Sequence, residues 1–178
     1  YKLRSSQETI NNLDLDSAIF FSQPLYIWYM TEQEYITLIE EILEVSSNFN
    51  ILYFKFHPSE KEDVKTRIKH LIETKKNVSL IEEDEIAEKI IVKYPVKYAV
   101  TFNSTAALNL IIKGVVPVFL NNIVSRRFPS PSLLQFDNFL CAIKCKTPSE
   151  ISQIRPGFSA FPAATVTTTT HTISEILN

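Results

Sequence analysis

Two short polar stretches carry residue types that bind anions, and each follows a run of strand-forming residues. In the first stretch, "FKFHP", Lys55 and His57 are two residues apart and therefore lie on one face of a strand that Pro58 ends. A histidine at this place can donate a hydrogen bond to a phosphate oxygen and, when protonated, can neutralise or protonate a leaving group. A satisfied structural histidine is the alternative interpretation of the same residue.

In the second stretch, Asn103, Ser104 and Thr105 precede a predicted helix. Two hydroxyls, the free backbone N–H groups of a first helical turn and the positive end of the helix dipole together form a site of phosphate size. A simple N-cap role for Ser104 or Thr105 explains the same residues. A third stretch, residues 22–24, follows the first predicted strand. The carboxyl ends of parallel strands lie at one edge of a sheet, where ligands bind, so we expect the three stretches to meet there.

A run of acidic residues, 82–85, lies between a predicted strand and a predicted helix. One of these carboxylates could accept both hydroxyls of a ribose, although solvation at a helix start explains the run as well. Arg126 and Arg127, in a predicted mobile loop, could reach an anionic group, but a solvent-facing basic pair is the simpler interpretation. The chain contains neither a G-x-G-x-x-G nor a P-loop motif, which disfavours NAD, FAD and P-loop ATP chemistry.

The elements that must position these residues alternate between strand and helix. Helices are expected to begin at Thr31 and Ser59 as N-caps, to follow the acidic run as far as Pro95, and to lead from Thr105 to Gly114. Strands are expected at residues 18–21, 50–56, 77–83, 96–102, 115–120 and 138–144. This alternation is typical of right-handed βαβ units, so we predict an α/β fold with an open, Rossmann-like parallel sheet and flanking helices.

We divide the chain into a leader or linker (1–17), the α/β domain (18–155) and an irregular, threonine-rich tail that ends in a short helix (156–178). The 178 residues carry a net charge of −2, which gives no reason to expect nucleic acid as a partner. Cys141 and Cys145 are interpreted as small core residues, without a metal or a disulfide. The longest apolar stretch is too short to span a bilayer, and no signal peptide is recognisable. The first residue, a tyrosine, suggests a fragment.

The order and spacing of "FFSQPL", "YFKFHP", the acidic segment and "FNSTAALNL" resemble the C-terminal nucleotide-binding domain of bacterial sialyltransferases of the GT-B type. The resemblance is to the lipooligosaccharide and capsule sialyltransferases and their polysialyltransferase relatives, whose hallmarks are an HP motif and an SS or ST motif. It covers residues 18–121.

This resemblance implies transfer of sialic acid from CMP-sialic acid to a cell-surface acceptor glycan, with inversion and without a metal or another cofactor. His57 would be the catalytic residue on the CMP phosphate, Pro58 would shape its turn, and Ser104 and Thr105 would bind the same phosphate. Glu85 would bind the ribose, with Glu82 and Glu83 as rivals. The cytidine pocket would be lined by Lys55, Ser22 and Gln23.

One departure from the family pattern matters. The general base of these enzymes lies in a D/E-D/E-G motif of the N-terminal domain, and this sequence has no such motif. We therefore expect a donor-binding half with little transferase activity by itself, completed by an N-terminal GT-B domain. The resemblance also implies a bacterial cytoplasmic protein and leaves open peripheral association with the inner membrane and a homo-oligomer. The alternatives are a GT-B half that uses a UDP or GDP donor and a non-enzymatic α/β interaction module.

Overall fold

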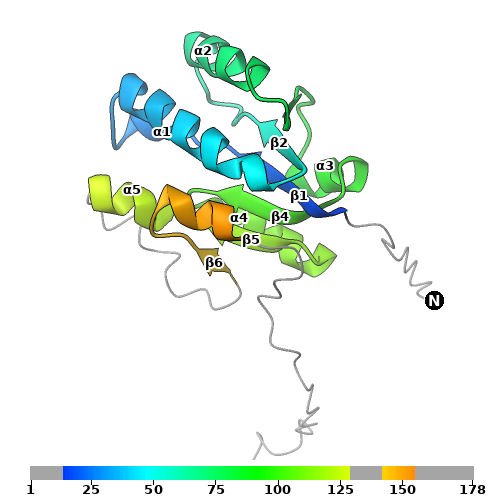
Figure 1. Cartoon of the computed structure of the whole chain (residues 1–178). Helices are drawn as coiled ribbons and strands as arrows, with labels where there is room; N and C mark the ends of the chain where they lie inside the picture. Colours follow the sequence, from blue (N-terminus) through cyan, green and yellow to red (C-terminus); the bar gives the residue numbers. More distant parts are fainter. Residues whose placement is uncertain (1–13, 129–141, 155–178) are drawn as a thin grey trace, which may run out of the picture.

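Six parallel strands form one open sheet in the computed structural model, which describes residues 14–128 and 142–154 (Figure 1). The strands stand in the order β3-β2-β1-β4-β5-β6, so β1 lies in the middle between β2 and β4. Their bounds are β1 Asp14–Phe21, β2 Ile51–Lys55, β3 Val78–Ile81, β4 Val96–Thr101, β5 Val116–Phe119 and β6 Ile143–Lys144. This order and the flanking helices confirm the predicted Rossmann-like α/β fold.

Helices and short 3₁₀ turns connect the strands. The helices are α1 Glu32–Val45, α2 Glu62–Glu73, α3 Ala87–Lys93, α4 Thr105–Asn109 and α5 Asn121–Arg127. The 3₁₀ turns are η1 Leu25–Ile27, η2 Ser46–Asn48, η3 Leu110–Lys113 and η5 Pro148–Gln153. β2 ends at Lys55, one residue before the predicted end, and of the predicted sixth strand only residues 142–144 belong to the described part of the chain.

Strand alternation divides the apolar residues between two cores. Phe20 and Phe54 point to the face that α1, α2 and α5 cover, and their rings pack 5.2 Å apart. Ile19 and Phe21 point to the opposite face, which α3 and α4 cover. Because both faces are covered, the strands read as nearly continuous apolar runs, as expected for a buried parallel sheet.

Helix α1 begins as the sequence predicts. The Thr31 hydroxyl accepts a hydrogen bond from the Glu34 backbone N–H at 3.2 Å, and the Glu34 carboxylate accepts from the Thr31 backbone N–H at 2.7 Å, which completes a capping box. An apolar stripe of this helix is buried against the sheet, and it contains Tyr35, Leu38, Ile39, Ile42 and Leu43. Helix α1 also lies beside α2 (Figure 1).

Two predicted helix positions are wrong. Ser59 does not cap α2: residues 58 and 59 form a turn, and α2 begins two residues later than predicted, with Lys61 as its N-cap. Arg126 and Arg127 lie in the last turn of α5 and not in a mobile loop. Arg127 makes an ion pair with Glu41 of α1 at 2.6 Å and therefore ties two helices together.

The helix after β4 is shorter than predicted. α4 has five residues and continues as the 3₁₀ turn η3, which ends at Gly114 as expected, with φ of +80°. Cys145 is buried, in agreement with its predicted core position, and burial raises the pKa of its thiol to about 12. The threonine-rich tail, its predicted helix, Cys141 and the leader up to residue 13 lie outside the described residues.

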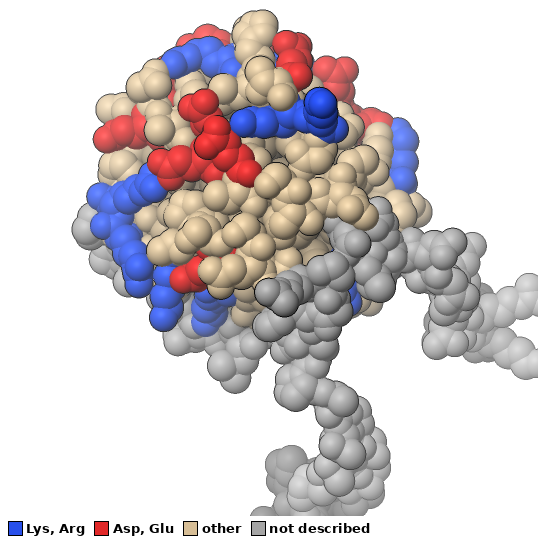
Figure 2. Space-filling model, in the orientation of Figure 1, with Lys and Arg blue, Asp and Glu red and all other residues tan. Residues whose placement is uncertain are grey.

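On the face shown in Figure 2, charges of both signs are mixed, and neither sign covers this face by itself. This mixture fits the net charge of −2. In the described ranges, no helix is long and apolar enough to cross a membrane.

Candidate functional site

A pocket of about 390 Å³ opens at the carboxyl edge of the sheet. It is lined by the ends of β1 and β2, by the loop that follows β3 and by the first turn of α4. His57, Ser104 and Thr105, which the sequence predicts to share one hollow, all line it together with Glu85. We call this pocket the central pocket. Its other predicted members are Lys55, Pro58 and Ser22.

Two smaller hollows adjoin the central pocket. One of about 360 Å³ lies between the ends of β2 and β3 and the start of α2, and it shares Lys55, His57 and Pro58 with the central pocket. The other, of about 200 Å³, lies beside the turn after β1 and is lined by Gln23, Trp28 and Asn103, and again by His57. We call these the β3-side pocket and the β1-side pocket. His57 is thus the residue that borders all three.

The ring of His57 is oriented by its own loop. Its Nδ1 accepts a hydrogen bond from the backbone N–H of Ser59 at 3.1 Å. The neutral imidazole therefore carries its proton on Nε2, which is the nitrogen left to donate to a ligand. The His57 side chain is exposed, so this donor is accessible from the pockets.

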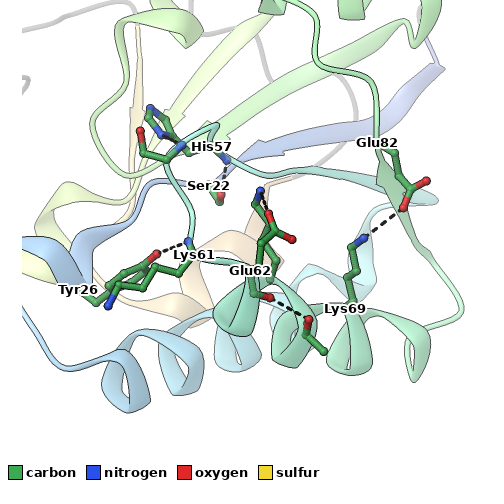
Figure 3. A network of polar contacts seen from close by, with 10 residues as sticks. Ser22, Tyr26, His57, Lys61, Glu62, Lys69 and Glu82 are labelled. Atoms are coloured by element: carbon green, nitrogen blue, oxygen red, sulfur yellow. Dashed lines mark hydrogen bonds and ion pairs between the residues drawn. The ribbon is translucent and has the colours of Figure 1, made fainter.

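A buried hydrogen-bond network holds the β2 loop, residues 56–61, against the domain (Figure 3). The backbone N–H of His57 donates to the Ser22 hydroxyl at 2.9 Å, as Figure 3 shows. Ser22 in turn donates to Oε1 of Glu60 at 2.9 Å, and the Tyr35 hydroxyl donates to the same oxygen at 2.6 Å. The Lys61 backbone N–H donates to the Tyr26 hydroxyl. The loop that carries His57 is therefore fixed from both sides.

Glu60 is the centre of this network and was not singled out from the sequence. Only 4% of the residue is exposed, and its Oε2 is buried without a hydrogen-bond partner among the described residues. Burial, followed by the charge of Glu60, raises the pKa of Tyr35 well above its usual value, and burial raises that of Tyr26 to about 12. The Tyr35 hydroxyl is a donor to the Glu60 carboxylate, and the Tyr26 hydroxyl accepts from the Lys61 backbone N–H.

Lys55 places a cation at the floor of the site. The residue is 9% exposed, lines both the central and the β3-side pocket, and its ammonium makes no ion pair with a described carboxylate. Lys65 and Lys69, which also line the β3-side pocket, are paired with Glu62 and Glu82. An ammonium that borders two pockets and has no ion pair with a described carboxylate can pair with an anionic ligand in those pockets.

Ser104 is the N-cap of α4, so the structural interpretation of this residue holds. Its Oγ accepts a hydrogen bond from the Ala106 backbone N–H at 3.2 Å. Ser104 still lines the central pocket beside Thr105, and both hydroxyls can donate. The dipole of a five-residue helix is weak, so anion binding here depends on the hydroxyls and on the charges of the β2 side rather than on the helix.

The acidic run forms the β3 loop, residues 82–86. Its carboxylates are held by surface ion pairs: Glu82 with Lys69, Glu83 with Lys93, and Glu85 with Lys89. Hydrogen bonds from Lys93 and then from Tyr94 lower the pKa of Glu83 to about 2. Among the three carboxylates considered for a ribose, only Glu85 lines the central pocket together with Ser104 and Thr105. Asp84, which belongs to the same acidic run, lines both that pocket and the β3-side pocket.

Two residues predicted to line the cytidine pocket, Gln23 and Ser22, make hydrogen bonds within the domain. Gln23 does not line the central pocket. Its Oε1 accepts from the Asn103 backbone N–H and the Thr101 hydroxyl, and its Nε2 donates to Oδ1 of Asn103 at 2.9 Å. The side chain thereby joins the ends of β1 and β4. Ser22 does line the pocket, but its hydroxyl is engaged with His57 and Glu60.

A Rossmann-like sheet with a polar pocket at its carboxyl edge is typical of nucleotide-binding α/β domains. The family model of glycosyltransferase family 52 matches residues 2–121, more than half of the 178 residues. The chain therefore belongs to glycosyltransferase family 52. No curated protein matches it in a sequence search.

Proposed function

We propose that this protein binds CMP-sialic acid and is the donor-binding part of an inverting, metal-independent sialyltransferase of the GT-B type. The observation that carries the proposal is the convergence of His57, Ser104, Thr105 and Glu85 on one pocket. These are the residues that the sequence resemblance assigns to the phosphate and the ribose of CMP. Membership of glycosyltransferase family 52 supports the class of reaction.

In the proposed reaction, the acceptor hydroxyl oxygen forms a bond to the anomeric carbon of the sugar while the bond from that carbon to the phosphate oxygen breaks. The electron pair leaves with CMP, so negative charge grows on the phosphate. The Nε2–H of His57 donates to this phosphate, and the hydroxyls of Ser104 and Thr105 and the ammonium of Lys55 add to the stabilisation. Because Nδ1 of His57 already accepts from Ser59, the imidazole acts as a neutral hydrogen-bond donor.

The remaining parts of the proposal follow from the resemblance. The acceptor hydroxyl must lose its proton to a base, and we propose that an N-terminal GT-B domain supplies it together with the acceptor glycan site. The chain alone is then expected to bind the nucleotide with little transfer activity. We further propose that the enzyme works in the bacterial cytoplasm, close to the inner membrane where cell-surface glycans are completed, and that it needs no cofactor.

Calorimetric titration of the chain with CMP, UMP and GDP tests the proposal. CMP should bind most tightly, and His57→Ala should weaken CMP binding by roughly 10- to 100-fold, because a hydrogen bond to a charged group is lost. His57→Gln, whose amide can place a donor near the Nε2 position, should retain part of the affinity. His70→Ala is the matched control, since His70 is exposed on α2 and lines none of the three pockets.

Tighter binding of UMP or GDP would mean that the donor is another nucleotide sugar and not CMP-sialic acid. An absence of affinity for all three nucleotides would contradict the proposal altogether.

A further inference from the structure

Trp28 is the most unusual aromatic residue of the described chain, because it is 70% exposed although the other large aromatic side chains beside it are at least partly buried. It follows the 3₁₀ turn η1, whose Leu25 is buried in the core. The Trp28 backbone N–H donates to the Leu25 carbonyl at 3.2 Å, so the exposed ring stands on an anchored turn. An aromatic ring that is held at a fixed place and borders a pocket can contact a ligand bound in that pocket.

The pocket beside Trp28 contains two amide side chains, those of Gln23 and Asn103. With Gln23, Tyr29 and Asn103, Trp28 lines the β1-side pocket of about 200 Å³. The Oδ1 of Asn103 is occupied by Gln23, but its Nδ2 makes no hydrogen bond to a described residue, and Nε2 of Gln23 has a second proton. An aromatic face beside amide donors fits a pyranose ring, whose C–H groups pack on the aromatic face while its hydroxyls and carboxylate accept from the amides.

The position of the β1-side pocket beside the central pocket indicates whether it would hold the ribose or the transferred sugar. Both pockets are lined by His57, the proposed contact of the phosphate. Glu85, the residue proposed first for the ribose, lines the central pocket and not the β1-side pocket. If the nucleoside extends from the phosphate into the central pocket, the other substituent of that phosphate can extend into the β1-side pocket, which His57 also borders.

We propose that the β1-side pocket, with Trp28 as its wall, is the subsite for the sugar ring that is transferred, an anionic pyranose linked to the phosphate. This inference rests on the proposed function, since it takes the phosphate position from His57. It assigns Gln23 and Asn103 as donors to the sugar, and it makes Trp28 a specificity residue that senses the glycosyl part of the donor but not the nucleotide.

The single tryptophan of the chain makes the test direct, because its fluorescence reports on this pocket alone. Emission of the unmodified protein is recorded during titration with CMP and, separately, with CMP-sialic acid, while calorimetry measures both dissociation constants. CMP-sialic acid should change the Trp28 emission and CMP should leave it nearly unchanged. Trp28→Ala should raise the dissociation constant of CMP-sialic acid by about three- to tenfold, from the loss of one aromatic contact, and that of CMP by less than about twofold.

Trp28→Phe keeps an aromatic face and should restore most of the affinity for CMP-sialic acid. Ile112→Ala is the matched control, because Ile112 is 83% exposed but lines none of the three pockets. An equal emission change with CMP would mean that Trp28 contacts the nucleotide, and it would overturn the inference. Calorimetric binding of CMP-sialic acid without an emission change would overturn it as well, with the proposed function intact. If neither compound binds, the proposed function fails and this inference fails with it.

Discussion

The β2 loop and the β3 loop border the same pockets but are held to the domain in opposite ways. The β2 loop, with His57, is fixed by hydrogen bonds to Ser22 and by the buried carboxylate of Glu60. The β3 loop is held by exposed ion pairs such as Lys69 with Glu82, whose side chains are largely in solvent. Buried hydrogen bonds depend on the whole packed core, whereas exposed ion pairs contribute little and are screened by salt.

This difference matches what the proposed reaction requires of each loop. A donor that must meet a developing charge is useful only if its position is fixed before the reaction, because no free energy is then needed to reorganise it. A carboxylate that receives ribose hydroxyls needs to adapt to a ligand that enters and leaves. The domain thus has a rigid side at β2 and an adaptable side at β3.

The largest expected effect comes from removing the buried anchor. Glu60→Ala leaves the Ser22 and Tyr35 hydroxyls without their acceptor, and we expect the free energy of unfolding in urea to fall by about 2–4 kcal/mol. Glu82→Ala, the matched change in the β3 loop, should alter it by less than about 0.5 kcal/mol. Equal losses in the two variants would contradict the distinction between the loops.

The next largest effect is expected on the free energy of unfolding at alkaline pH, through Tyr26, which bonds the β2 loop. Burial raises the pKa of Tyr26 from 10.0 to about 12, so the folded protein holds this proton more tightly than the unfolded chain. The stabilisation from this group is complete below pH 10 and is lost as the pH rises towards 12. Tyr26→Phe should flatten this part of the curve of unfolding free energy against pH, whereas Tyr53→Phe should leave it unchanged.

The free energy of unfolding at acid pH should report on the β3 loop, with a smaller effect. Lys93 and Tyr94 lower the pKa of Glu83 from 4.5 to about 2, so its contribution to stability is complete above pH 4.5 and is lost as the pH falls towards 2. Glu83→Gln should therefore reduce the acid dependence of the unfolding free energy. Glu62→Gln serves as the control, because Glu62 is an exposed carboxylate on α2. An unchanged slope in Glu83→Gln would show that the Glu83 contacts do not hold the loop.

The smallest expected effect is that of salt. Raising the ionic strength from about 0.01 M to about 1 M shortens the screening length from about 30 Å to about 3 Å, which weakens exposed ion pairs. Amide hydrogen exchange should become about two- to threefold faster in residues 82–86, the equivalent of a loss of about 0.5 kcal/mol. The amides of His57 and Glu60 should exchange at an unchanged rate, and faster exchange there would remove the contrast between the loops.

Much of the fold follows from local sequence patterns. Thr31 with Glu34 forms the cap that its spacing predicts, and the five apolar residues of α1 share the buried face because a helix repeats every 3.6 residues. The same local logic fails at Ser59, whose type favours an N-cap but which lies in a turn two residues before the actual N-cap, Lys61. It also fails for the length of α4, which changes to a 3₁₀ turn at Leu110. At both places the observed boundary differs from the one that local propensity predicts.

The candidate site divides in the same way. Alternation in the strand and the proline that follows were enough to place Lys55 and His57 at one edge, and the parallel order of strands brought Ser104 and Thr105 to the same pocket. Nothing in the sequence marked Glu60 as buried, because a glutamate in "PSEKED" is one of several acidic residues there and is normally solvated. Trp28 gave no signal either, since a lone aromatic residue in an apolar segment is usually part of a core.

The sequence by itself determined the α/β class, the order of the elements and the edge at which the polar residues gather, because these depend on periodicity and on caps within a few residues. Only the tertiary structure decided which polar groups are available to a ligand. Ser22 bonds Glu60 across 38 residues, Gln23 bonds Asn103 across 80, and Arg127 bonds Glu41 across 86. Hydrogen bonds over such separations form only when the whole sheet is assembled, since chain closure must first be offset by the burial of the core.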